Sequence, residues 1–301
     1  MTKVKPFVKW AGGKTQLLDE LADRLPSSVK ESGVIDNYIE PFVGGGAFFF
    51  YLKARYDIKN AVLIDNNTDL INAYKIVKNN SRELIKRLAT LQKSYLKKTS
   101  AERERFFYKM RDEYNRARGK RVSSVSDRVN RAALLIALNK TCFNGLYRQN
   151  SKGKFNVPHG RYKNPRILDE ENLLAVSRAL KGVKLIRGDF ERARGYARRD
   201  TLIYFDPPYR PLNATSSFTA YTKDGFSDDD QRRLAKLCRD LSDLDASLIL
   251  SNSDPGNENA RDRFFHKIYD GFNISRVEAS RMLNCDGARR GHISELLISN
   301  F

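Results

Sequence analysis

The residues best suited to chemistry form the run Asp206-Pro207-Pro208-Tyr209, which directly follows the apolar stretch Thr201–Phe205. The exocyclic amino group of a nucleobase is a poor nucleophile, because its lone pair is delocalised into the ring. Hydrogen bonds from that group to a carboxylate and to a backbone carbonyl localise the lone pair, and two prolines hold such a carbonyl in an exposed turn. The ring of Tyr209 can stack on the base. Catalysis would then depend on alignment with an activated sulfonium and on preorganised polar groups rather than on a general base.

A glycine turn, Gly44-Gly45-Gly46, follows the apolar run Tyr38–Val43, and Asp65 ends the next apolar run. Glycines after a first strand let a ligand approach the backbone, and an acid at the end of the second strand commonly holds ribose hydroxyls. A dinucleotide fingerprint would need a further glycine at position 49, where this chain has Phe49. The shorter form favours a smaller nucleoside cofactor such as S-adenosylmethionine. A glycine turn without a ligand is the alternative.

The run Gly12-Gly13-Lys14-Thr15 looks like the end of a phosphate-binding loop. That loop needs a glycine five residues before Gly13, where this chain has Val8, so the NTPase interpretation is not favoured. Lys14 could instead pair with a carboxylate, such as that of a methionine moiety. Trp10 offers a stacking face nearby.

The net charge of +19 comes from one segment of the chain. Residues 1–72 hold 9 basic and 9 acidic side chains, and residues 167–301 hold 21 of each. Residues 73–166 hold 25 basic and 6 acidic side chains, and no Asp or Glu lies in 132–166. Nucleic acid is the natural partner, because neutralising phosphates releases condensed counterions. A solvated helical surface without a ligand is the alternative.

The end of this basic segment interleaves aromatic residues with Arg, Lys and Asn, in Asn144–Asn150 and Phe155–Lys163. Arg can read guanine, Asn can read adenine, and an aromatic ring can wedge into the base stack. A base inside a duplex is out of reach of a pocket, so the enzyme would have to flip it out. A patch that contacts only phosphates is the alternative.

Apolar runs and breaks predict alternating strands and helices. We expect helices at 16–25, 47–53, 70–77, 83–118 and 131–140, and a loop or small hairpin at 144–165. We expect strands at 37–42, 61–64, 183–186, 202–205, 247–250 and 293–298. A further helix should follow Ser227, with Asp228–Asp230 at its positive end. The pattern predicts an α/β protein in which a mostly helical segment is inserted between the second and third strands of an otherwise parallel sheet.

Cys142, Cys238 and Cys285 lie far apart, with no CxxC pair and no His at ligand spacing. We therefore expect reduced, buried thiols and no metal site. No apolar stretch approaches the roughly 18 residues that a membrane helix needs, and the first ten residues lack an apolar signal core. We expect no membrane association and a cytoplasmic location.

Taken together, these motifs resemble the DNA adenine methyltransferases of the Dam and DpnII-methylase type. The resemblance covers nearly the whole chain. Its motifs are Phe7–Lys14, Ile39–Gly46 with Asp65, Asn144–Pro165, Gly188–Phe190, Asp206–Tyr209 and Ser217–Thr222. One departure is His159, where an aromatic ring is commoner in the family.

The resemblance implies roles for individual residues. The S-adenosylmethionine site would be lined by Trp10, Lys14, Phe42, Gly44, Gly46, Asp65, Asp189, Phe190 and Asp206. Asp206, Pro207, Pro208 and Tyr209 would hold the target adenine. Leu146, Arg148 and Asn150 would read the sequence, Tyr162 would intercalate, and Lys9, Arg161 and Lys163 would touch DNA. His159, His266 and His292 are expected at the surface or in packing, since a neutral amine attacking a sulfonium needs no general base.

The resemblance also implies a Rossmann-like S-adenosylmethionine-dependent methyltransferase sheet, formed by residues 1–72 and 167–301, with residues 73–166 as the DNA target-recognition domain. The implied reaction is methylation of the adenine 6-amino group in duplex DNA, within GATC, after base flipping. A cognate restriction endonuclease is a possible genetic partner. The alternatives are a methyltransferase acting on RNA adenine or protein glutamine, and a non-catalytic DNA-binding regulator. Asp206 favours adenine as the substrate, because glutamine methyltransferases usually carry Asn at this position. The intact run Asp206–Tyr209 argues against a non-catalytic DNA-binding regulator.

Overall fold

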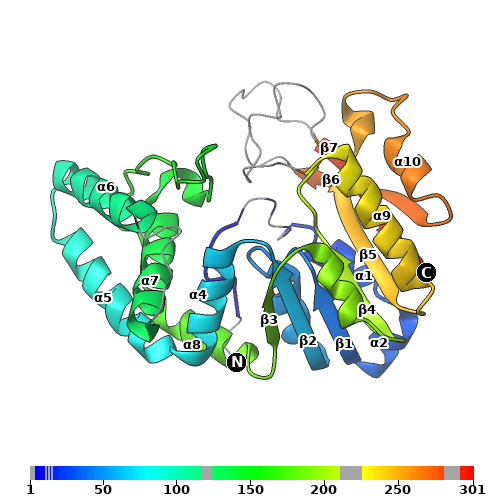
Figure 1. Cartoon of the computed structure of the whole chain (residues 1–301), viewed down its shortest axis with the longest axis horizontal. Helices are drawn as coiled ribbons and strands as arrows, with labels where there is room; N and C mark the ends of the chain where they lie inside the picture. Colours follow the sequence, from blue (N-terminus) through cyan, green and yellow to red (C-terminus); the bar gives the residue numbers. More distant parts are fainter. Residues whose placement is uncertain are drawn as a thin grey trace.

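A computed structural model describes residues 4–10, 12, 14, 16–116, 124–210, 226–280 and 292–301. Within these ranges the strands form one sheet in the order β3-β2-β1-β4-β5-β7-β6 (Figure 1). The strands are β1 (Val34–Glu40), β2 (Asp57–Asp65), β3 (Lys184–Arg187), β4 (Thr201–Phe205), β5 (Ser247–Ser253), β6 (Asn273–Ser280) and β7 (His292–Ser299). The predicted α/β class with a Rossmann-like sheet is confirmed.

Helices flank this sheet and build a separate lobe beside it (Figure 1). They are α1 (Leu18–Asp23), α2 (Ser27–Ser32), α3 (Ala47–Lys53), α4 (Thr68–Asn79), α5 (Ser81–Leu96), α6 (Ser100–Arg116), α7 (Val125–Thr141), α8 (Glu170–Ala179), α9 (Asp228–Ser242) and α10 (Phe264–Ile268). The short 3-10 turns are η1 (Phe143–Gly145), η2 (Phe190–Gly195) and η4 (Pro255–Asn257).

The central strands β1 and β4 have buried side chains on both faces. In β1 and β4, Tyr38 and Leu202 point into one apolar cluster, whereas Ile39 and Ile203 point into the other. Successive side chains of a strand face opposite sides, so a strand covered on both sides needs a nearly continuous apolar run. Helix α9 covers the second face, with its start capped by Ser227 as predicted.

The expectation of an otherwise parallel sheet is wrong at its far end. Strand β7 runs antiparallel to both β5 and β6. Strand β6 was also not predicted, because its apolar residues Ile274 and Val277 are separated by polar residues without a regular alternation. It lies at the edge of the sheet, where one face and one row of backbone groups meet solvent, so no continuous apolar run marks it.

The helices of the inserted segment begin at capping residues rather than at the apolar pattern. The predicted helix 83–118 is two helices, and Thr99, whose backbone N–H donates to Glu102 Oε2 at 2.8 Å, starts the second. Helix α7 begins before the predicted 131, because Ser124 Oγ accepts from the backbone N–H of Asp127 at 3.0 Å. A helix start leaves backbone N–H groups unpaired, and such side chains satisfy them.

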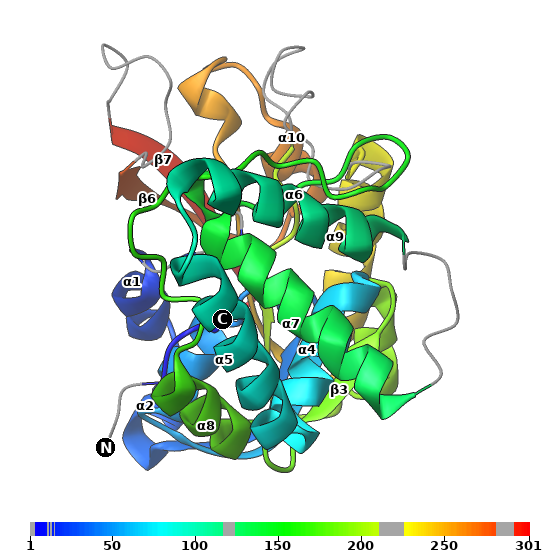
Figure 2. The same cartoon turned by 90° about the vertical axis from the view of Figure 1, so that its left-hand side faces the viewer.

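The inserted helices share one apolar core with the sheet. The cluster that contains Tyr38 and Leu63 of the sheet continues to Leu88 of α5 and Leu135 of α7. Helix α4 lies between the two parts, contacting β2 and β3 as well as α5, α7 and α8 (Figure 2). The 72/73 boundary falls inside this helix, and the division into two domains stays a prediction.

Residues 144–165, called the hairpin segment below, contain little regular structure, as predicted. Two isolated antiparallel bridges, Cys142 to His159 and Gln149 to Phe155, shape it. His159 is a packing residue, one of the two alternatives expected, since it is buried and its Nε2 lies 2.6 Å from the Tyr95 hydroxyl.

The thiols of Cys142 and Cys238 are free and buried as predicted, and Cys285 lies outside the described residues. Within the described ranges no group of three or more His, Cys, Asp or Glu side chains could hold a metal ion. The helices of these ranges include none that is long and apolar enough to cross a membrane.

We predict that Arg131→Met lowers the free energy of unfolding by about 3 kcal/mol, because removing one partner leaves a buried charge unpaired. Arg131 of α7 donates to Asp69 of α4 through Nη2 at 2.8 Å, and the two side chains are 8% and 14% exposed. Urea denaturation measures the loss. The double variant Asp69→Asn/Arg131→Met should be more stable than Arg131→Met, and a single-variant loss under about 1 kcal/mol would contradict the prediction.

Candidate active site

The predicted cofactor and catalytic residues come together at the carboxyl ends of four parallel strands. This edge is where open α/β sheets bind ligands. Phe42, Gly44 and Gly46 follow β1, Asp65 ends β2, Asp189 and Phe190 follow β3, and Asp206–Tyr209 follow β4. Trp10 and Lys14 reach the same edge from the N-terminal segment, as the contacts below establish.

The glycine turn is crowded on its protein side. Gly44 and Gly46 have φ values of +47° and +70°, a conformation that other residues rarely adopt. A Cβ on Gly44 would lie 2.8 Å from Cδ1 of Trp10, and one on Gly46 would lie 2.6 Å from the hydroxyl of Tyr74. That hydroxyl donates to the Gly44 carbonyl at 3.1 Å. Side chains at either glycine would therefore displace the turn.

Asp65 fixes the turn from the neighbouring strand. Its Oδ2 accepts from the backbone N–H of Gly44 at 3.1 Å, and its Oδ1 accepts from the N–H of Asn67 at 2.8 Å. Burial raises the pKa of Asp65 to about 6. The two hydrogen bonds favour the ionised carboxylate and partly offset the effect of burial. The carboxylate thus joins the turn after β1 to the start of α4.

One face of Trp10 is already covered. Its ring stacks on Tyr147 with centroids 4.7 Å apart and planes 16° apart. The predicted stacking residue therefore lies between the glycine turn and the hairpin segment. Lys9, next to it, is exposed.

Lys14 lies among the catalytic candidates. Its Nζ is 2.9 Å from Oε2 of Glu295 in β7 and 3.5 Å from Oδ1 of Asp206. The same Nζ lies 3.9 Å from the ring centroid of Tyr209, whose hydroxyl donates to Glu295 Oε2 at 2.6 Å. Residues from three distant segments are thereby held around one ammonium group.

Asp206 is a buried carboxyl with a shifted proton affinity. Burial raises its pKa to about 6, Lys14 lowers it, and Glu295 raises it. Ser251 Oγ donates to its Oδ1 at 3.1 Å. At neutral pH Asp206 is therefore mostly ionised and able to accept hydrogen bonds.

Glu40 and Glu295 were missed as site residues. Glu40 ends β1 and accepts from the Tyr38 hydroxyl at 2.7 Å, and burial raises its pKa to about 8, so that it is mostly protonated at neutral pH. Glu295 interrupts the apolar run at 293–298, which is the signal that could have identified it. An acid inside a buried strand needs a partner, here Lys14.

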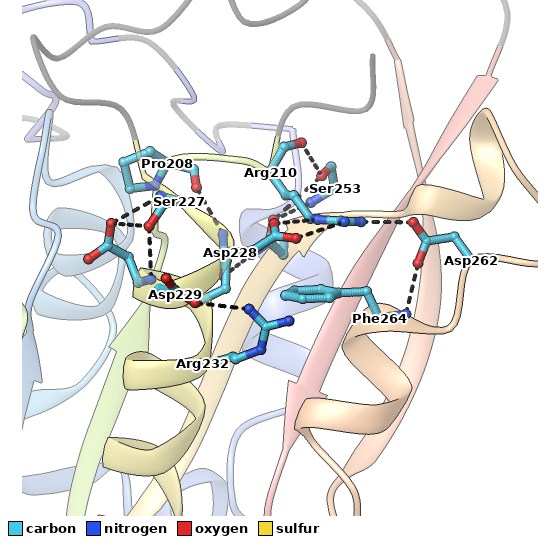
Figure 3. Close-up of polar contacts among 12 residues, drawn as sticks. Pro208, Arg210, Ser227, Asp228, Asp229, Arg232, Ser253, Asp262 and Phe264 are labelled. Carbon is cyan, nitrogen blue, oxygen red and sulfur yellow. Dashed lines mark hydrogen bonds and ion pairs between the residues drawn. The ribbon is translucent and has the colours of Figure 1, made fainter. Parts of the chain in front are cut away.

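Hydrogen bonds and ion pairs hold the chain after β4 (Figure 3). Gln231 Nε2 donates to the Pro208 carbonyl at 3.3 Å. The Arg210 side chain donates to Asp228 and Asp262 and lies 4.2 Å from the ring centroid of Phe264. In the described part of the chain no hydrogen-bond donor reaches the carbonyl of Pro207.

Aromatic side chains form the wall beside β3. The rings of Phe42 and Phe190 stack with centroids 5.4 Å apart, and Phe226 packs edge-on against both. Asp189 is exposed, and its Oδ1 lies 3.3 Å from Nη2 of Arg233.

The predicted DNA-reading residues lie on the hairpin segment, apart from the catalytic run. The exposed ones are Arg148, Arg161, Tyr162 and Lys163. Leu146 packs against the core, and Asn150 Oδ1 accepts from the backbone N–H of Lys154 at 3.0 Å. The Nε of Arg148 donates to Asn156 Oδ1 at 3.1 Å, which orients its guanidinium.

A groove between α6 and the hairpin segment carries basic residues that the sequence analysis did not single out. Its basic lining consists of Arg105, Lys109, Arg111, Arg116 and Lys154, and Asp112 is its only acid among the described residues. Arg105, Lys109 and Arg116 are spaced along α6 so that they lie on one side of the helix, a signal that counting charges over the whole segment does not reveal.

Residues 10–283 match the D12 class N6 adenine-specific DNA methyltransferases. The chain is 52% identical over 300 residues to the type II methyltransferase M.MjaIII of Methanocaldococcus jannaschii, covering 99% of this chain and 100% of that protein. It is 38% identical to the type II methyltransferase M1.LlaDCHI of Lactococcus lactis, covering 99% and 96%. It is 35% identical to a DNA adenine methylase of Serratia marcescens, covering 99% and 98%.

We predict that Asp206→Asn stabilises the protein at pH 8 and has little effect near pH 4. The folded-state pKa of Asp206 lies above that of the unfolded chain, so the wild type loses stability as pH rises from about 4 to 6. The variant does not titrate and should gain about 2–3 kcal/mol above pH 6. Urea denaturation at both pH values measures this gain. The exposed Asp36→Asn serves as control, and an equal effect at both pH values would contradict the prediction.

Proposed function

Because the chain belongs to the D12 class N6 adenine-specific DNA methyltransferases, we propose that it methylates the 6-amino group of adenine in duplex DNA with S-adenosylmethionine, within GATC. Family membership makes it an adenine-specific DNA methyltransferase. The donor, the target sequence and the flipping of the base are the proposed parts. The observation that supports transfer to an amino group is the largely buried carboxylate of Asp206 at the strand edge, beside Lys14.

The residues at the strand edge fit the donor. The turn at Gly44 and Gly46 has no room for side chains and is held by Asp65, and the stacked pair Phe42 and Phe190 offers an aromatic wall. Bound there, S-adenosylmethionine supplies a methyl group activated by a sulfonium. We assign its binding to Trp10, Lys14, Phe42, Gly44, Gly46, Asp65, Asp189, Phe190 and Asp206.

Asp206 and the Pro207 carbonyl are the acceptors for the two hydrogens of the target amino group. Accepting both hydrogens concentrates the nitrogen lone pair away from the ring, toward the methyl group. Lys14 favours the ionised carboxylate, and the Pro208 carbonyl is occupied by Gln231. These groups are oriented before the substrate arrives, so little reorganisation is needed during transfer.

Tyr209 provides the stacking surface for the flipped base. Its hydroxyl is fixed by Glu295 and one side of its ring is covered by Lys14, which leaves the other side for the base. A reaction at the strand edge requires the adenine to leave the duplex. Tyr162, with 39% exposure, can fill the gap in the stack.

The hairpin segment and the basic groove are the proposed DNA surface. Arg148, with Leu146 and Asn150, reads bases, while Lys9, Arg161 and Lys163 contact the backbone. The groove between α6 and the hairpin segment adds phosphate contacts. Two relatives are named type II methyltransferases, so we include a cognate restriction endonuclease as genetic partner.

The test of the function is incubation of the purified protein with labelled S-adenosylmethionine and unmethylated plasmid, followed by base-resolved mapping of methyladenine. Methylation confined to GATC is the expected result. Methylation at another motif would overturn the target sequence and leave the chemistry. Tight DNA binding without methylation would overturn the proposed transfer and favour a non-catalytic DNA-binding regulator. RNA and a glutamine-containing peptide, tested in parallel, should stay unlabelled.

We predict that Asp206→Ala lowers the methylation rate by about 10²-fold or more, because the amino group loses a preorganised acceptor. Its affinity for DNA should stay within a few fold of the wild type, since Asp206 lies away from the hairpin segment. Single-turnover rates and a filter-binding titration measure the two effects. Full activity in this variant would contradict the assignment of Asp206 as the acceptor for the target amino group.

We predict that Arg148→Ala relaxes the base preference at one position of the site, at a cost of about 1–3 kcal/mol in discrimination. Lys154→Ala, in the groove, is the matched control, and it should weaken binding to all sequences alike and reduce the salt dependence. Binding to single-substitution duplexes at several salt concentrations measures both. Equal loss on all sequences for Arg148→Ala would mean that Arg148 contacts only phosphate.

A further inference from the structure

The N-terminal segment is clamped to the start of the hairpin segment by one buried side chain. Asn139 of α7 is 2% exposed. Its Oδ1 accepts from the backbone N–H of Lys9 at 2.8 Å, and its Nδ2 donates to the carbonyls of Lys9 and Gly145, each at 2.8 Å. The segment that leads to Trp10 and Lys14 therefore moves with the segment that leads to Arg148.

Trp10 and Tyr147 form the second connection. Tyr147 is 3% exposed and directly precedes Arg148. Its ring stacks on Trp10. The indole of Trp10 also contacts the glycine turn, since a Cβ on Gly44 would lie 2.8 Å from Cδ1 of Trp10. Consecutive Cα atoms are about 3.8 Å apart, so a displaced Tyr147 would displace Arg148 with it.

The other side of Tyr147 leads back to the same glycine turn. Tyr147 and Tyr114 interact electrostatically, and the Tyr114 hydroxyl donates to Asp69 Oδ2 at 2.7 Å. Asp69 lies in the first turn of α4, two residues after Asn67, whose N–H donates to Asp65. Asp65 accepts from Gly44, which closes a ring of contacts around the proposed donor site.

We propose that the Trp10–Tyr147 stack couples the two sites, so that donor binding orders the start of the hairpin segment and cognate DNA tightens donor binding. Tyr147 is thereby a positioning residue that acts through Trp10 and Arg148. The proposal rests on the proposed function. A ligand shifts an equilibrium only by its differential affinity for the two states, and Trp10 is the group shared by the donor site and the stack. Coupling between two binding sites is reciprocal by thermodynamic necessity.

The experiment measures the dissociation constant of S-adenosylhomocysteine, the demethylated donor, with and without a GATC duplex, and that of the duplex with and without S-adenosylhomocysteine. Calorimetry of the whole protein gives both. In the wild type the two ratios should agree and reach about fivefold or more. In Tyr147→Leu, which removes the stack and keeps apolar volume, both ratios should fall to within twofold of one. A merely structural role would alter single affinities or thermal stability and leave the ratio unchanged.

Tyr147→Phe is the matched control, because it keeps the ring on Trp10 and loses only the hydroxyl contacts. It should retain most of the wild-type ratio. Trp10 is the only tryptophan of the chain, so its fluorescence reports the stack directly, and the emission of the free protein should change in Tyr147→Leu and not in Tyr147→Phe. A wild-type ratio in Tyr147→Leu would overturn the proposal, and so would a wild-type ratio of one.

Hydrogen exchange of the wild type tests the same coupling without a substitution, which matters if Tyr147→Leu does not fold. Addition of S-adenosylhomocysteine alone should slow exchange of the backbone amides of residues 145–150. Unchanged exchange, at a concentration that saturates the protein, would overturn the proposal. Failure of the proposed function is a different result, since the wild type would then neither methylate plasmid nor bind S-adenosylhomocysteine.

Discussion

The ammonium group of Lys14, between Asp206 and Glu295, is the contact on which the active-site edge depends. The three residues come from the N-terminal segment, the end of β4 and strand β7, and all are largely buried. Two carboxylates cannot share a site cut off from water without a cation between them, because desolvation and mutual repulsion both favour protonation. The raised pKa of Asp206 shows that Lys14 compensates this cost only in part. The ionised Asp206 next to the proline turn therefore lowers the free energy of unfolding of the protein.

The helical lobe and the sheet are joined through polar contacts as well as through a shared apolar core. Asp69 with Arg131 ties α4 to α7, and Asn139 ties α7 to the N-terminal segment. Such contacts have defined directions, whereas apolar packing tolerates sliding, so they fix the orientation of the hairpin segment relative to the strand edge. The proposed base-reading residues and the proposed reacting groups are therefore connected through these contacts.

The sequence predicted the elements whose side chains are buried on both faces, and the site residues that follow them. Strand β4 and the second half of β2 are continuous apolar runs, and the acids that follow these runs, Asp65 and Asp206, stand out for that reason. Strand β6 was not predicted because Ile274 and Val277 lie among polar residues, and such a sequence has neither a continuous apolar run nor a regular alternation. Glu295 was not predicted because its role depends on where β7 pairs, and pairing between β5 and β7 is set by tertiary packing rather than by local spacing. The clamp by Asn139 is equally non-local, since its partner Lys9 lies in another part of the chain.

The insertion of β7 between β5 and β6 has a consequence for the order in which the protein matures on the ribosome. Synthesis proceeds from the N-terminus, so the basic lobe, which is the proposed DNA surface, emerges well before Glu295 does. Until β7 enters the sheet, Lys14 and Tyr209 lack their common partner, and β5 and β6 have no strand between them. In a nascent chain the residues of the basic lobe would therefore be synthesised before the contacts around Lys14 can form.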